Sequence, residues 1–189
     1  LKILYFDFNL DHFGLTLRGD ESIGQYTERV LNFLFGEGSG DSGTRDASVR
    51  GASELNGWVQ TSPRVYYFSW ATEQTVDSGI NGFQIPELGM NGFLNAGALY
   101  MGSYQTDGPV VIDSSWWNND GVVNTRSMRG PEINSSDIII AFDGNPSRGD
   151  WNYRGVLKST GHVKAGGIGK DMLSWYASQA EFLAGLDRE

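Results

Sequence analysis

The stretch SVRGASELNGWVQTSPRVYYFSW, residues 48–70, joins a helix pattern directly to a strand pattern. Over 48–60 the apolar residues recur at the spacing of one helix face, at Val49, Ala52, Leu55 and Val59. The aromatic and β-branched run at 65–70 is typical of a buried strand. A helix that leads through a short turn into a buried strand is characteristic of α/β proteins, so this stretch predicts the fold class.

The rest of the chain continues this alternation of helices and strands. Apolar residues at helical spacing predict helices over 21–35 and 170–186, and a weaker pattern predicts one over 91–100. Short apolar runs predict three further strands, at 110–112, 138–142 and 153–157. Together these elements favour a mostly parallel sheet flanked by helices, in a single domain that covers residues 1–189.

The composition excludes several classes of partner. Acidic residues number 23 against 14 basic ones, a formal net charge of −9, and no run of Lys or Arg could neutralise a row of phosphates. We therefore expect neither nucleic acid nor an anionic membrane as a partner. We also expect no transmembrane segment, because no stretch approaches the roughly 20 apolar residues that span a bilayer. Cysteine is absent, which excludes disulfides, thiolate zinc sites and a cysteine nucleophile.

Two residues on predicted loops are candidates for acid–base chemistry. Asp120 lies between Asn119 and Gly121, a strong turn signal, so it is either a plain turn residue or a carboxylate that orients a histidine. His162 is one of only two histidines, and it lies between a predicted strand and the last helix. It is either a hydrogen-bonded surface residue or a base presented to a cleft. The other histidine, His12, is interpreted as structural.

A serine nucleophile is missing from the sequence. The strained elbow of α/β-hydrolases requires G-x-S-x-G after a strand, and no serine in this chain satisfies that pattern. Ser39 and Ser42 come nearest, but their spacing is wrong and they lie in the glycine-rich loop at 36–43. We interpret both as linker residues.

Several segments in the same order along the chain carry a resemblance to a known family. They are FDFNLDHFGL at 6–15, VRGASELN at 49–56, SP at 62–63, TE at 72–73, PELGMN at 86–91 and NDGVVNT at 119–125. With these segments the chain resembles the large triacylglycerol lipases that include thermoalkalophilic and staphylococcal bacterial enzymes and their plant relatives. The resemblance implies the C-terminal part of an α/β-hydrolase fold and hydrolysis of lipid esters by a Ser-His-Asp mechanism.

The resemblance also implies roles for individual residues. Asp120 matches the triad acid of the family and His162 matches its base, while the serine and part of the oxyanion hole lie upstream of the matched region. We therefore expect the N-terminal half of the same fold as a partner, and we expect this chain to be inactive alone. Secretion is the location that the resemblance implies.

The metal sites of the bacterial relatives are not reproduced in this sequence. Their calcium site uses a backbone carbonyl at the position of Gly89, a glutamate at the position of Lys164 and an aspartate that Asp171 matches only approximately. An ammonium group cannot coordinate calcium, so we expect no calcium, with Lys164 supplying positive charge near the Gly89 carbonyl. Asp41 matches one ligand of their zinc site, but one carboxylate cannot make a zinc site. We therefore expect no cofactor.

Two other functions remain open at this point. The chain could be a non-catalytic protein with an α/β-hydrolase-like fold, or a carbohydrate-binding β-sandwich, since glycine, asparagine and exposed tryptophan are common in such modules. The predicted helices at 21–35 and 170–186 argue against a sandwich. Three aromatic residues either line an acyl-binding cleft or belong to the core: Phe13, Trp70 and Trp116.

Overall fold

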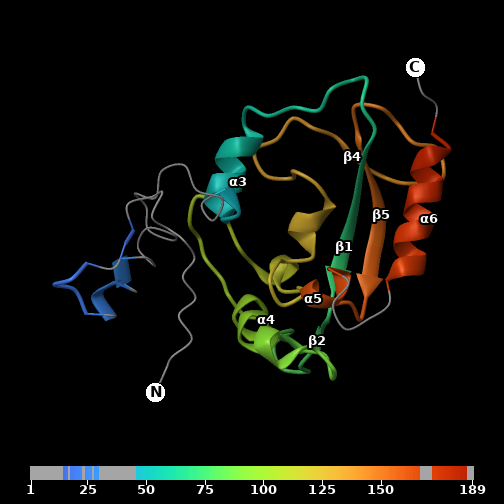
Figure 1. Ribbon diagram of the computed structural model, residues 1–189. Coiled ribbons are helices and arrows are strands. Elements are labelled where there is room, and N and C mark those ends of the chain that lie inside the picture. Colours follow the sequence, from blue (N-terminus) through green and yellow to red (C-terminus); the bar gives the residue numbers. More distant parts are fainter. Residues whose placement is uncertain are drawn as a thin grey trace. The chain divides into compact units, whose positions relative to one another are not determined.

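The computed structural model describes residues 15–16, 18–22, 24–26, 28–29, 46–166 and 172–186 (Figure 1). Contacts between Cα atoms divide the chain into two compact units, Leu1–Leu55 and Asn56–Glu189, and each is considered by itself. The prediction of a single domain over 1–189 stays a prediction.

The first unit contains helical residues at 24–26 and 28–29, within the helix predicted over 21–35. Residues 21–22 are described and are not helical, and the other residues of that predicted range, 23, 27 and 30–35, lie outside the described residues. Arg29 donates to both carboxylate oxygens of Glu21, at 2.8 and 2.7 Å, and this pair ties the helical segment to the residue that lies just before it. Helix α3, Val49–Asn56, forms where the sequence predicts it but ends four residues early. Gly57 follows its last residue, and glycine is a poor helix former.

The second unit is built on a parallel sheet with strand order β1-β5-β4. Its strands are β1, Tyr67–Glu73; β4, Ile139–Ala141; and β5, Trp151–Lys158. Both β1 and β4 pair parallel with β5, and Trp151 opposes Tyr67 on one side and Ile139 on the other. The strands predicted at 65–70, 138–142 and 153–157 are therefore present. This sheet and its flanking helices confirm the α/β fold class, and a β-sandwich of facing antiparallel sheets does not fit it.

A bulge in β5 bends the central strand. Between Ser69 and Ala71 of β1 the register advances two residues, while β5 advances three, from Tyr153 to Val156. Gly155 lies inside this step with φ +99°, a left-handed conformation that glycine adopts without steric cost.

Helix α6, Leu173–Ala184, covers one face of the sheet through aromatic contacts (Figure 1). The ring of Phe182 meets Phe68 edge-on at 5.0 Å, and Trp175 meets Trp70 at 5.6 Å. The Arg154 guanidinium lies 4.0 Å from the Phe182 ring centroid, and burial lowers the pKa of this group. Trp70 is thus a contact of α6, which the sequence predicts over 170–186; residues 170–171 are not described.

The opposite face takes the segment around the short helix η4, Arg126–Arg129. Ser69, which alternates with Phe68 and Trp70 along β1, donates from Oγ to the Arg129 carbonyl at 2.5 Å. Trp116, in the short helix η3 at Ser114–Trp116, is buried, so it belongs to the core. Phe13, the third aromatic candidate, lies outside the described residues.

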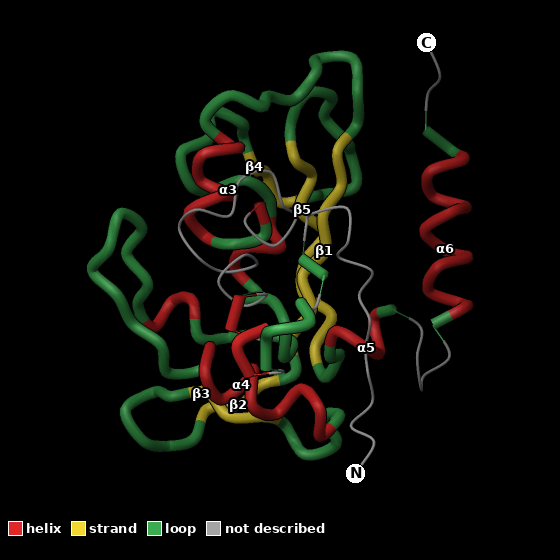
Figure 2. The backbone as a smooth tube through the Cα atoms, turned by 60° about the vertical axis from the view of Figure 1, so that its left-hand side comes forward, coloured by secondary structure: helices red, strands yellow, loops and turns green. Residues whose placement is uncertain are grey.

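Residues 74–112 depart most from the sequence prediction. An antiparallel pair that was not predicted, β2 at Thr75–Asp77 and β3 at Gln84–Pro86, lies beside α4, Asn95–Met101 (Figure 2). The range predicted as helix, 91–100, contains the short helix η2, Gly92–Leu94, and nearly all of α4, which ends one residue beyond it. The strand predicted at 110–112 is wrong, because that run forms only an isolated bridge between Thr106 and Ile112 after the bend at Gly108 and Pro109. None of the helices in the described ranges is long and apolar enough to cross a membrane.

Candidate active site

Asp120 is held in a turn that buries it completely. Its Oδ1 accepts hydrogen bonds from the backbone N–H groups of Val122, at 3.0 Å, and Val123, at 2.8 Å. Gly121 has φ +97°, and a Cβ there would lie 2.7 Å from Cβ of Leu94, so only glycine fits at this position. The Asn-Asp-Gly signal thus marks a real turn, and the same turn satisfies one oxygen of the carboxylate.

Asn119 ties this turn to neighbouring elements and is also fully buried. Its side-chain Nδ2 donates to the carbonyls of Ala98, at 3.1 Å, and Trp117, at 2.9 Å, while Oδ1 accepts from Gly121 N. Its backbone carbonyl accepts from Gln74 N just beyond β1, at 2.9 Å. These contacts fix the turn against both α4 and the end of β1, so the position of Asp120 is determined by the core.

His162 begins the short helix α5, His162–Ala165, a few residues after β5 ends. Its Nδ1 lies 3.0 Å from Oδ2 of Asp120, and its backbone N–H donates to the Asp120 carbonyl, also at 3.0 Å. Because an ionised carboxylate only accepts hydrogen bonds, Nδ1 is the donor, and in the neutral imidazole Nε2 is left as the acceptor. The His162 side chain is 50% exposed, whereas that of Asp120 is 1% exposed. The structure therefore brings together the two residues proposed from the sequence.

The loop before His162 is fastened at several points to the ends of other strands. Thr160 N donates to the Glu73 carbonyl at 2.9 Å, and Ser159 Oγ donates to Glu87 Oε1 at 2.7 Å. Lys158 pairs with the buried carboxylate of Glu73. These bonds determine where α5 starts and so where the imidazole lies.

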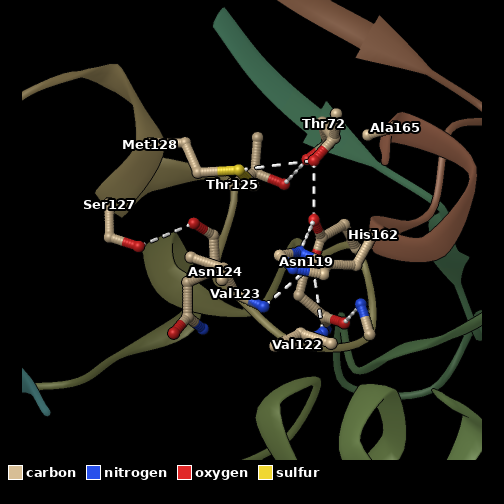
Figure 3. A network of polar contacts seen from close by, with 12 residues as sticks. Thr72, Asn119, Val122, Val123, Asn124, Thr125, Ser127, Met128, His162 and Ala165 are labelled. Atoms are coloured by element: carbon tan, nitrogen blue, oxygen red, sulfur yellow. Dashed lines mark hydrogen bonds and ion pairs between the residues drawn. The ribbon is translucent and has the colours of Figure 1, made fainter. Parts of the chain in front are cut away.

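Thr72 is a residue of this site that sequence reasoning missed. Its hydroxyl donates to Asp120 Oδ2 at 2.7 Å, the same oxygen that accepts from His162 (Figure 3). The sequence held a signal for it, since Thr72 and Glu73 form one of the segments that carry the resemblance to lipases. The pattern did not say why a threonine stands there.

The metal-site positions give no ligand cluster in the described residues. Asp41 and Asp171 lie outside the described residues. Gly89 has φ +97°, and Lys164 donates from Nζ to the Ser159 carbonyl at 2.5 Å. Across the described ranges, no three His, Cys, Asp or Glu side chains gather as a metal site would require.

A polar cavity of about 390 Å³ lies beside the histidine loop. Its lining includes the carboxylates of Glu73, Asp77 and Glu87 together with Lys158 and Ser159. Neither Asp120 nor His162 lines it, and its charged walls do not suit an acyl chain.

The chain matches the family described as "Lipase-like, C-terminal domain" over residues 2–186. It belongs to this family. The lipase of Staphylococcus hyicus is 29% identical over 177 residues, which cover 93% of this chain and 25% of that lipase. The resemblance to staphylococcal lipases is thereby confirmed.

Solved structures agree with this membership. EstA from Clostridium botulinum superposes with a TM-score of 0.83 at 38% identity, over 95% of this chain and 43% of that one. Lipase 1 from Pelosinus fermentans superposes with a TM-score of 0.75 at 40% identity, over 97% of this chain and 49% of that one. The lipase-like chain thus spans between a quarter and a half of these relatives.

Proposed function

We propose that this chain is the C-terminal part of an α/β-hydrolase that hydrolyses lipid esters, with Asp120 as the triad acid and His162 as the base. One observation carries the proposal: the Nδ1 of a half-exposed histidine lies 3.0 Å from a completely buried aspartate. Burial fixes the carboxylate, and exposure leaves Nε2 accessible to a reacting group. The substrate class, lipid esters, is taken from the relatives that are named lipases.

In this proposal the serine comes from a part of the protein outside this chain. The sequence has no G-x-S-x-G, and no serine in the described ranges bonds to the His162 ring. The serine Oγ attacks the ester carbonyl carbon while Nε2 of His162 takes the hydroxyl proton. The imidazolium, stabilised by Asp120, then gives that proton to the departing alcohol oxygen. Water, activated by the same imidazole, hydrolyses the acyl-enzyme and frees the serine.

Exposed apolar side chains next to residues that contact the site suggest that another part of the protein covers them. Leu88 and Phe93 are almost fully exposed, and Val122, two residues after Asp120, is half-exposed. Leu88 follows Glu87, which accepts from Ser159 in the histidine loop, and Phe93 precedes Leu94, which packs against Gly121. Apolar side chains gathered on a surface mark places that another part of a protein covers. We propose that the serine-bearing part packs there.

Calcium is absent from this proposal. Lys164 occupies the position where the resemblance puts a glutamate ligand, and its ammonium group donates to the Ser159 carbonyl in the histidine loop. A fixed positive charge there opposes a divalent cation. Calorimetric titration should detect no tight calcium binding, and tight binding that disappears in Asp171→Asn would contradict this part.

Secretion also stays a proposal, one that cell fractionation of the producing organism would test.

A chimera tests the proposed function. The chain is fused to the part of Pelosinus fermentans lipase 1 that it does not match, and hydrolysis of p-nitrophenyl butyrate is measured. We expect ester hydrolysis that falls at least about 10⁴-fold in His162→Ala. The chain alone should not react with a fluorophosphonate probe. Stoichiometric serine labelling of the chain alone, or full activity of the His162→Ala chimera, would contradict the proposal. A non-catalytic relative would give a folded chimera that is inactive from the start.

A further inference from the structure

The two oxygens of the Asp120 carboxylate are held by different parts of the fold. Oδ1 accepts from Val122 N and Val123 N, which belong to the same turn as Asp120 itself. Oδ2 accepts from the Thr72 hydroxyl at 2.7 Å and lies 3.0 Å from His162 Nδ1. The bonds to Oδ1 hold one end of the carboxylate, and they leave its plane free to tilt about that end. The direction of Oδ2 therefore depends on a residue outside the turn.

Thr72 is itself held firmly in place. It is buried, it opposes Leu157 in the pairing of β1 with β5, and its carbonyl accepts from Thr125 Oγ1 at 2.9 Å. A β-branched side chain on a strand has few χ1 positions, so the hydroxyl has little freedom. Met128 Sδ lies 3.3 Å from Thr72 Oγ1, but a thioether is a weak acceptor. The one hydroxyl proton therefore goes to the nearer and stronger acceptor, Asp120 Oδ2.

We propose that Thr72 is a positioning residue for the acid–base pair: its hydroxyl turns the Asp120 carboxylate so that Oδ2 faces Nδ1 of His162. The inference rests on the proposed function and deepens it, because an aspartate orients a histidine only if the aspartate is oriented first. Among the described residues, Thr72 is the one side chain besides His162 that bonds to Oδ2. It connects the sheet directly to the site (Figure 3).

Nuclear magnetic resonance of the His162 ring tests this in the 189-residue chain, with no need for catalysis. In the unaltered chain we expect the Nδ1–H tautomer, with a ring N–H signal at low field that exchanges slowly with water. In Thr72→Val, which keeps the shape and removes the hydroxyl, that proton should exchange roughly tenfold faster, the factor that one hydrogen bond to a charged group contributes. The Nδ1–H tautomer should also become less populated.

Two further variants separate positioning from general packing. Thr72→Ser keeps the hydroxyl and should retain slow exchange. Ser69→Ala removes another β1 hydroxyl, the one that bonds to the Arg129 carbonyl, and should leave the His162 ring signals unchanged. Should Thr72→Val fail to fold, the unaltered chain still tests the geometry on which the proposal rests: a nuclear Overhauser effect should connect the Thr72 hydroxyl proton to the ring N–H of His162, and its absence would overturn the proposal.

Asp120→Asn provides the reference for interpreting a failure. If Asp120→Asn disturbs the ring signals and Thr72→Val leaves exchange unchanged or slower, the role of Thr72 is overturned while the acid–base pair stands. If Asp120→Asn has no effect either, the pair itself is overturned and the proposed function with it.

Discussion

The Asp120 turn and the His162 loop are two halves of one site, and they are built in opposite ways. Asn119 and Asp120 of the turn are fully buried, and each oxygen of the Asp120 carboxylate has two hydrogen-bond partners. The histidine loop is held by a backbone hydrogen bond from Thr160 to the Glu73 carbonyl and by the exposed side-chain bond from Ser159 to Glu87. It leaves half of the His162 side chain exposed. An orienting group benefits from rigidity, whereas a base must remain accessible to the group that it deprotonates. The difference predicts that mutations in the two halves have unequal effects.

The largest difference should appear when each member of the pair is truncated. Asp120→Ala removes the acceptor of the buried Thr72 hydroxyl and of two backbone N–H groups. A buried donor left without a partner costs about 1–3 kcal/mol, and the loss of the two part-buried N–H bonds adds to that cost, so we expect the free energy of unfolding to fall by about 3 kcal/mol or more. His162→Ala should cost less than about 1 kcal/mol, since its side chain is half-exposed.

Urea unfolding followed by tryptophan fluorescence measures both variants of the pair. Equal losses of stability in Asp120→Ala and His162→Ala would contradict the comparison between a rigid turn and an open loop.

A pair of glycines makes the same comparison on the backbone. Gly121, in the turn, has φ +97° and a Cβ position 2.7 Å from Leu94 Cβ, while Gly166, at the end of α5, has φ −70° and no neighbour nearer than 3.5 Å. Gly121→Ala should lower the free energy of unfolding by about 2 kcal/mol through strain and overpacking. Gly166→Ala should change it by less than about 0.5 kcal/mol. Comparable urea midpoints for the two variants would show that the turn is less tightly packed than described.

The smallest expected effect concerns Glu21, a carboxylate outside the site. An ion pair with Arg29 holds it, whereas a buried turn holds Asp120. The hydrogen bond from Arg29 lowers the pKa of Glu21 from its ordinary value of 4.5 to about 2. Because the pKa is lower in the folded state, this pairing stabilises the folded chain above pH 4.5 and is lost as the pH falls from 4.5 towards 2. Carbon-13 titration of the Glu21 carboxyl should show a midpoint near 2 that returns towards 4.5 in Arg29→Gln. An unchanged midpoint in Arg29→Gln would contradict the assigned cause.

Sequence patterns predicted those parts of the fold in which burial and periodicity agree. The aromatic run that becomes β1 packs against the apolar face of α6, as the contact between Phe68 and Phe182 illustrates. The apolar run at 110–112 failed as a strand because the bend at Gly108 and Pro109 folds the chain back on itself and leaves Ile112 with a single bridge to Thr106. Such pairing is not visible in a local pattern. The β2–β3 pair was missed because strand pairing is likewise not visible in a local pattern.

The sequence predicted the two residues of the candidate site, Asp120 and His162, but not the contacts that hold them in place. Asp120 and His162 were selected by a turn signal, a loop position and a resemblance, each of which is a local property. The contact from Thr72 spans 48 residues, and only the arrangement of β1 beside the turn creates it. Likewise, nothing local predicts that the Glu73 carbonyl holds Thr160.

A double-mutant cycle in the chimera tests most directly the central claim that Asp120 and His162 act as one catalytic unit. The value of kcat/KM for p-nitrophenyl butyrate is measured in Asp120→Asn, His162→Ala and the double variant. Because residues of a triad act together, we predict that the double variant is no slower than His162→Ala, although Asp120→Asn alone loses about 10⁴-fold. Losses that multiply in the double variant, or an Asp120→Asn chimera with full activity, would contradict the claim.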